Sequence, residues 1–361
     1  MRIPNIVCLA ILPVAVACSK EEYGYVATLG NDTISIEHIT RKRNTITGDL
    51  VERSPRVIRK HWTVKFNSDG SLHDWTMEER ALNLNAENPP LVTYKANLVS
   101  DSFLTVPWEA YDYGTYELLF EQAAKQNSDT VPVRQVQPGY GQHGKALVRK
   151  QKDGSVTFVS TGLAGTGVAQ LDANGRMKSY SGKHTTYKQE VVRTTDIPDI
   201  DAIAARFAAA EKNAPVKSLS PLDTTTATIG PATLTIEYSR PGRRGRNIMG
   251  DVVEYDKVWR TGANKATHFT TTAPLNVSGV AVPPGTYTLW TLPTKSGVFL
   301  IINHQTGQWG TRYDPRRDLA RIPMTVTTTP TRTENFTIAI DRSALRLEWD
   351  NFRWMVSVMA Q

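Results

Sequence analysis

Two short runs indicate the fold class: Leu234-Thr235-Ile236-Glu237-Tyr238, which alternates apolar and polar side chains, and Val298-Phe299-Leu300-Ile301-Ile302, which is apolar throughout. The first pattern is typical of a strand with one face in the core, and the second of a central strand covered on both faces. At least six short strands of this kind recur between residues 227 and 361. This spacing predicts a β-sandwich for the C-terminal part of the chain.

Strand patterns also dominate residues 24–195. A hairpin is predicted where a strand at 56–66 is followed by the turn Asn67-Ser68-Asp69-Gly70 and a strand at 72–77. The period changes at 108–125, where apolar residues recur as in a helix. The pattern therefore predicts a mainly β chain whose first domain is a curved antiparallel sheet or half-barrel with one helix.

A linker is predicted between these two domains, over residues 196–226. Its first part has the pattern of a helix, because Ile203, Phe207 and Ala210 fall on one face. Proline and threonine residues then accumulate between Pro215 and Thr226, as is typical of an exposed joint. The expected domains are thus 24–195 and 227–361.

The first eighteen residues are typical of an export signal. Arg2 supplies a positive charge, and residues 3–17 are almost wholly apolar and uncharged. This run is shorter than the ~20 residues that a membrane-spanning helix requires, and it suits a signal peptide. We therefore expect an exported protein of the bacterial cell envelope.

Cys18 is the candidate lipidation site. The run Ala15-Val16-Ala17-Cys18 resembles a bacterial lipobox, in which the cysteine is diacylated and becomes the new N-terminus. The alternative is simple signal cleavage after Ala17. The only other cysteine is Cys8, inside the apolar run, and an unmodified lone thiol is a liability in an oxidising compartment. The resemblance implies a lipid anchor in the membrane, and Ser19 favours an outer-membrane lipoprotein facing the periplasm or the surface.

Five separate blocks carry a resemblance in the C-terminal part. They are Tyr238-Ser239-Arg240-Pro241, a Gly245–Gly250 block, Val258–Thr267, Pro284–Leu289 and Gln308-Trp309-Gly310. In this order they resemble a bacterial family known as domain of unknown function 2911. The resemblance implies a compact β domain found in exported proteins. It implies no activity, because no chemistry is assigned to that family.

The most concentrated polar signal is Trp259-Arg260-Thr261-Gly262-Ala263-Asn264. Gly262 and Asn264 suit a turn with positive φ, and an arginine beside a tryptophan can clamp a carboxylate, a phosphate or a sugar hydroxyl. The alternative is that Arg260 forms a structural ion pair with Glu237 or Asp256. We predict ligand binding by Arg240, Trp259, Arg260, Thr261, Asn264 and Trp309.

Charge indicates the kind of ligand. Residues 227–361 contain 16 Lys+Arg against 10 Asp+Glu, and most of the cations are arginines. Arginine suits bidentate recognition of planar anions. The expected partner is an anionic glycan or a lipid headgroup. We expect no nucleic-acid partner, because no interleaved aromatic motif accompanies the basic residues, and the sequence leaves the oligomeric state open.

Evidence for catalysis in the sequence is sparse. It contains neither a G-x-S-x-G nor an H-E-x-x-H motif, and its seven histidines lack metal-ligand spacing, so no metal or cofactor is predicted. His268 with Asp256, or His304 with Asp314, could form an acid–base pair. The favoured function is a non-catalytic binding or structural module. The alternatives are a hydrolase of envelope glycans or esters and a half-barrel lipid carrier.

Overall fold

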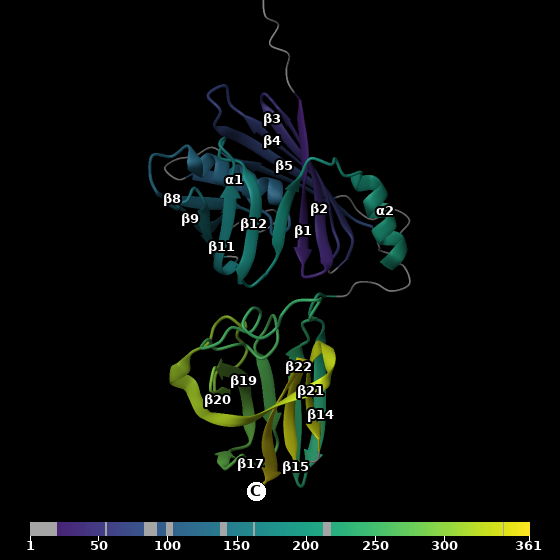
Figure 1. The fold of residues 1–361 in the computed structure, drawn as a ribbon, viewed down its shortest axis with the longest axis vertical. Helices are drawn as coiled ribbons and strands as arrows, with labels where there is room; N and C mark the ends of the chain where they lie inside the picture. Colours follow the sequence, from purple (N-terminus) through teal and green to yellow (C-terminus); the bar gives the residue numbers. More distant parts are fainter. Residues whose placement is uncertain are drawn as a thin grey trace, which may run out of the picture.

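The computed structural model describes residues 20–54, 56–82, 92–98, 104–137, 143–161, 163–211, 218–341 and 343–361. Within these residues two large β-sheets follow one another along the chain, and neither closes on itself (Figure 1). The predicted mainly β fold is confirmed. No helix of this described part is long and apolar enough to cross a membrane.

The first sheet has thirteen strands in the described residues, ordered β6-β5-β4-β3-β2-β1-β13-β12-β11-β10-β9-β8-β7. The strands are β1 (Glu21–Leu29), β2 (Asp32–Lys42), β3 (Thr45–Glu52), β4 (Ile58–Phe66), β5 (Leu72–Ala81), β6 (Val92–Asn97), β7 (Leu104–Pro107), β8 (Thr130–Val136), β9 (His143–Lys150), β10 (Val156–Ser160), β11 (Leu163–Leu171), β12 (Met177–Thr185) and β13 (Glu190–Thr194). All neighbours are antiparallel except β7 and β8. That parallel pair departs from the predicted antiparallel sheet, because a helix joins the two strands as a crossover.

This crossover is helix α1 (Tyr113–Ala124), which begins where the Asp112 side chain accepts a hydrogen bond from the backbone N–H of Thr115. Nearly every residue of α1 is buried, and the helix contacts strands as far apart in the sheet as β2, β9 and β12. The sheet therefore curves around α1. Tyr116 and Phe120 pack there against Phe158 in the first hydrophobic core.

Helix α2 (Ile200–Glu211) lies in the segment predicted to connect the domains. It packs against the outer face of β2 and β3, where Ile200, Ala204 and Phe207 bury Val51 and Val57 (Figure 1). This apolar contact attaches α2 to the first sheet.

The second sheet has nine strands in the described residues, ordered β14-β15-β16-β19-β20-β21-β22-β17-β18. They are β14 (Leu222–Ile229), β15 (Ala232–Ser239), β16 (Thr267–Thr271), β17 (Leu275–Val277), β18 (Val280–Val282), β19 (Gly285–Thr294), β20 (Gly297–Asn303), β21 (Asp318–Asp341) and β22 (Ala344–Ala360), with a short 3₁₀ turn at Pro315–Arg317. β21 and β22 are far longer than the short strands predicted. Register shifts along their hairpin allow these long strands to bend.

This bending brings the two halves of the second sheet face to face. The Tyr238 hydroxyl on β15 accepts a hydrogen bond from the backbone N–H of Ile338 on β21 (3.0 Å), and Thr225 on β14 donates to the carbonyl of Ile338 (2.7 Å). Side chains from both halves share one hydrophobic core, separate from that of the first sheet. The arrangement is that of a β-sandwich.

The two sheets meet through polar contacts. The backbone N–H of Asn31 donates to the carbonyl of Arg244 (2.8 Å), and the Arg244 guanidinium pairs with Asp32. A second ion pair joins Lys183 Nζ to Asp251 Oδ1 (2.8 Å). These contacts hold one side of a cleft that opens between the two sheets.

Candidate functional site

The cleft has a volume of about 860 Å³ and is lined by both parts of the chain. The first sheet contributes the end of β1 and the turn between β12 and β13, at residues 184–189. The second contributes the loop that precedes β16, at residues 241–264, and the segment 309–313. Residues 218–220, just before β14, line the cleft as well. A site at such an interface is a common place for a small-molecule ligand.

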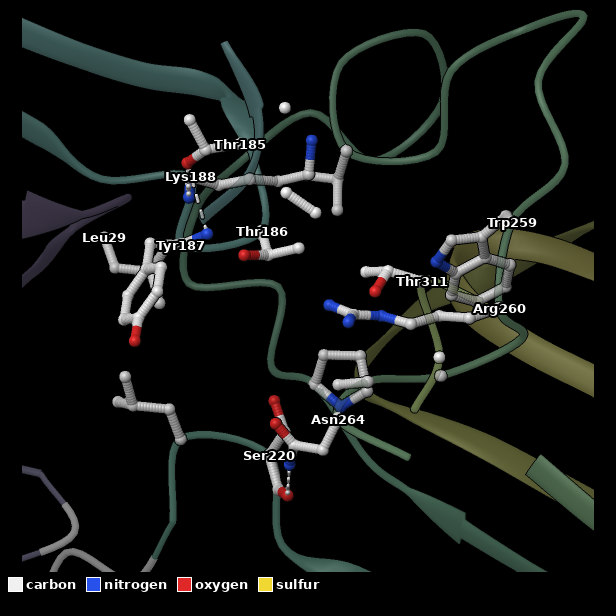
Figure 2. A pocket seen from close by; sticks show the side chains of 18 of the residues that line it. Leu29, Thr185, Thr186, Tyr187, Lys188, Ser220, Trp259, Arg260, Asn264 and Thr311 are labelled. Carbon is white, nitrogen blue, oxygen red and sulfur yellow. Dashed lines mark hydrogen bonds between the residues drawn. The ribbon is translucent and has the colours of Figure 1, made fainter. Parts of the chain in front are cut away.

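Arg260 points into this cleft (Figure 2). Its backbone position is set by its neighbour Trp259, whose N–H and C=O both pair with Thr291 on β19 (2.8 and 3.0 Å). The chain then turns sharply, with positive φ at Thr261 and Gly262. Gly262 must be a glycine, because a Cβ there would lie 2.8 Å from the carbonyl oxygen of Ser239.

Arg260 has no ion pair or hydrogen bond with any residue that the structure describes. The predicted alternative, an ion pair with Glu237 or Asp256, is therefore not formed. Burial alone lowers the pKa of the Arg260 guanidinium to about 10. A largely buried cation without a partner is costly to the folded state, so its presence at a cleft points to a ligand.

Arg246 is a second cation of the cleft without a carboxylate partner among the described residues. Its Nε donates to the carbonyl of Arg243 (3.0 Å), and a terminal nitrogen donates to that of Gly242. These bonds fix the guanidinium but do not neutralise it. Burial, with a contribution from Arg244, lowers the pKa of Arg246 to about 10.

Lys188 brings a third cation from the first sheet. It sits at positive φ in the turn between β12 and β13, where the Thr185 hydroxyl accepts hydrogen bonds from the backbone N–H groups of Tyr187 (3.2 Å) and Lys188 (3.4 Å) (Figure 2). Burial lowers the pKa of Lys188, and the nearby cations Arg260 and Arg246 lower it further, while Glu254 opposes them. Positive charge from both sheets therefore faces the same cleft.

An aromatic wall borders these cations. Trp259 is half-buried and stacks on Trp349 (ring centroids 5.9 Å apart), with Phe336 against its edge (5.0 Å). Trp309 also lines the cleft and keeps 48% of its surface exposed. Trp290, Trp349 and Trp354 are buried. An exposed Trp beside unpaired cations suits a ligand with an anionic group and an apolar or sugar face.

The structure brings together four of the six predicted ligand residues: Trp259, Arg260, Asn264 and Trp309. The side-chain amide of Asn264 donates to the Ser220 carbonyl (3.3 Å) and to the Ser239 hydroxyl (3.4 Å), which ties the site to the start of β14 (Figure 2).

The other predicted residues lie elsewhere. Arg240 forms an ion pair with Asp223 (3.1 Å) and donates to Thr337 and to the Phe336 carbonyl, so it joins strands and lies outside the cleft. Thr261 is fully buried beneath the turn. Cys18 falls outside the described residues.

Two cleft residues were missed by the sequence prediction. Arg246 belongs to the arginine-rich run at residues 240–246, but nothing in the sequence distinguishes it from Arg243 and Arg244 as a site residue. No sequence pattern marks Lys188 as a site residue, because it reaches the site only through the contact between the two sheets.

The two predicted acid–base pairs do not form. His268 Nε2 instead accepts a hydrogen bond from the backbone N–H of Gly307 (2.9 Å), and the Asp314 carboxylate accepts from Arg316. Over the described ranges, no group of three or more His, Cys, Asp or Glu residues is arranged to hold a metal ion.

These features define a two-part, mainly β protein with a cationic cleft between the parts. Residues 220–358, which form the second sheet, match the family described as "Protein of unknown function (DUF2911)". The resemblance predicted from the sequence is thus confirmed for the C-terminal part, and the N-terminal part matches no family. Comparisons with curated proteins and with solved structures gave no match.

Proposed function

We propose that this protein is an exported, non-catalytic binding protein that holds a small anionic ligand in the cleft between its two sheets. The observation that carries the proposal is the unpaired guanidinium of Arg260, which points into a cleft of about 860 Å³. An anion bound there would supply the missing counter-charge, and a planar guanidinium donates in pairs to a carboxylate or phosphate.

Two observations favour this function over its alternatives. A hydrolase was expected to use His268 or His304 with a carboxylate, and these histidines have other contacts in the structure. A lipid carrier would need an apolar cavity in the first sheet, and helix α1 fills that side with buried aromatic side chains. The Arg-lined cleft is therefore the site that the geometry supports best.

Binding is tested by titrating sulfate, inorganic phosphate, acetate and glucuronate into the full chain at constant ionic strength, with thermal unfolding and Trp fluorescence as readouts. Arg260→Met keeps a long side chain but removes the charge. It should abolish anion-dependent stabilisation and, without ligand, raise the free energy of unfolding by about 1 kcal/mol, because a site residue is not optimised for folding.

Arg317→Ala is the matched control, because it removes one exposed positive charge outside the cleft. This variant should bind anions as the wild type does. Equal responses of Arg260→Met and Arg317→Ala to every anion would show that the effect is general screening, and the proposed function would be wrong. Loss of stability in Arg260→Met by several kcal/mol would indicate a structural role for the cation instead.

We further propose that the chain is anchored to a membrane through a lipid on Cys18. The support is the apolar run at 3–17 followed by the last cysteine of the chain. In a bacterial host the wild type should partition into detergent, and Cys18→Ala should not. Mass spectrometry that finds a mature N-terminus at Cys18 without acyl groups would contradict the anchor.

A further inference from the structure

The cleft has more positive charge than one monoanion can balance. Lys188, Lys257, Arg246 and Arg260 all line it, and Lys188 is near enough to the other three cations and to the carboxylate of Glu254 for their charges to act on it. Glu254 is already shared, since it lies 2.5 Å from Lys257 Nζ, 3.8 Å from His184 Nδ1 and 4.0 Å from Lys188 Nζ. Among the described residues, neither Arg246 nor Arg260 forms an ion pair with a carboxylate, and only Arg246 is near enough to Glu334 and Asp32 for their charges to act on it. Two guanidiniums of the cleft therefore lack a paired counter-charge.

Another part of the cleft lining has the opposite character. Glu52 and Glu109 line the cleft as well, and both face Lys60, at 2.9 and 3.7 Å. Two carboxylates sharing one lysine repel a further anion, so an anionic group is directed to the side of Arg246 and Arg260. The neutral hydroxyl groups of Ser54 and Tyr111 also line the cleft and suit the hydroxyl groups of a ligand body.

The cations also come from three separate segments. Lys188 belongs to the β12–β13 turn of the first sheet, while Arg246 and Arg260 lie at two places in the loop between β15 and β16. A flat carboxylate offers two oxygens in one plane. A phosphate offers three oxygens in different directions and carries close to two negative charges at neutral pH.

Resting on the proposed function, we propose that the group bound beside Arg260 is a doubly charged phosphate monoester, carried by a hydroxyl-rich body that lies along Trp309. The phosphate would balance Arg246 and Arg260 together, and Lys188 would bring the first sheet into the same contact. A monocarboxylate would leave one of the two guanidiniums unpaired.

The test uses simple anions of known charge on the full chain at constant ionic strength. Sulfate, a dianion throughout, should bind at least about tenfold more tightly than acetate or nitrate, since one further ion contact of about 1.4 kcal/mol is a factor of ten. The affinity for inorganic phosphate should rise between about pH 5.5 and 8, as its second proton leaves. Sulfate measured over the same range is the control for pH effects that arise from the protein's own groups around the cleft and not from the ligand.

Variants locate the effect. Lys188→Gln and Arg260→Lys should each reduce the preference for sulfate over acetate several-fold, while Arg317→Ala leaves it unchanged. Arg260→Lys keeps the charge, so a loss there reports the planar geometry of the guanidinium. Glucose 6-phosphate should bind more tightly than glucuronate, which has a similar ring with one negative charge. Vesicles containing phosphatidate test whether the same phosphate chemistry comes from a lipid headgroup.

The possible failures are distinguishable. Binding that depends on Arg260 but is equal for sulfate and acetate, with no rise for phosphate at higher pH, would overturn the dianion inference and leave the proposed function intact. Absence of any Arg260-dependent anion binding would overturn both.

Discussion

Asp112 and Glu37 form a buried carboxyl pair at the start of helix α1. Glu37 accepts hydrogen bonds from Trp62 Nε1 (2.9 Å) and from the backbone N–H of Gly114 (2.8 Å). Asp112 Oδ1 accepts from Thr115, but its buried Oδ2 faces no donor. Burial raises the pKa of Glu37 to about 6, and burial together with Glu37 raises that of Asp112 well above its usual value. We therefore expect Asp112 and Glu37 to share a proton.

The sign of the pH effect follows from these raised pKa values. The pair stabilises the fold fully below the unfolded pKa values near 4, and this contribution is lost as pH rises through about 6 and above. Asp112→Asn keeps the helix cap and donates an N–H to Glu37 without needing a proton. At pH 8 it should exceed the wild type in free energy of unfolding by about 1 kcal/mol.

Urea unfolding at pH 5, 6.5 and 8 measures this difference, with Asp129→Asn as the control at an exposed carboxyl. Asp112→Asn and Asp129→Asn should have similar free energies of unfolding at pH 5, whereas at pH 8 that of Asp112→Asn should be the higher of the two. A pH dependence of Asp112→Asn that runs parallel to the wild type would show that the pair does not share a proton.

At the scale of elements, the turn after Trp259 places the side chain of Arg260 beside the segment 309–311. The backbone N–H of Gly310 donates to the Asn264 carbonyl (2.9 Å), which brings 309–311 alongside the turn. A Cβ at Gly310 would lie 2.6 Å from Arg260 Cδ. Because residue 310 has no side chain, the side chain of Arg260 has room to pass it and reach the cleft.

Gly310→Ala should displace Arg260 and weaken anion affinity by about tenfold, with a loss of about 1–3 kcal/mol in stability from overpacking. Gly297→Ala is the matched control, because a Cβ there meets nothing within 4 Å. The measurement is sulfate titration of both variants. Unchanged affinity in Gly310→Ala would mean that Arg260 need not pass this point to bind an anion.

At the scale of the whole molecule, the cleft exists only while the two sheets stay together. Their backbones lie close together at Gly30, where φ is +61° and a Cβ would lie 2.0 Å from the Arg244 carbonyl oxygen. The neighbouring contact from Asn31 to that same carbonyl depends on this approach.

Gly30→Ala should therefore separate the sheets, raise the radius of gyration in small-angle scattering and weaken sulfate binding by about tenfold. Each sheet should keep its own cooperative unfolding, because the two hydrophobic cores share no buried residue. Gly70→Ala is the control: it imposes the same kind of backbone strain at positive φ (+82°), but a Cβ there meets no atom within 4 Å. It therefore distinguishes the effect of backbone strain from that of a lost contact between the sheets. Identical behaviour of the two variants would contradict this role for Gly30.

The sequence by itself determined the mainly β fold, the two helices and the resemblance of the C-terminal part, because strand alternation and helical period are local properties of the chain. The sequence also singled out Arg260, because it stands in the short run Trp259–Asn264 together with an aromatic residue and residues typical of a turn. It did not reveal the parallel pair of β7 and β8 or the cleft, which depend on how distant segments meet.

Only the tertiary structure separated Arg240 from Arg260. Both are arginines in a basic region, but Arg240 meets Asp223 across two strands, whereas Arg260 meets an open volume. Lys188 joined the site although it lies in a different sheet. Whether a charge is neutralised depends on groups that are distant in the sequence and on how much water surrounds the charge. The local sequence pattern determines neither of these.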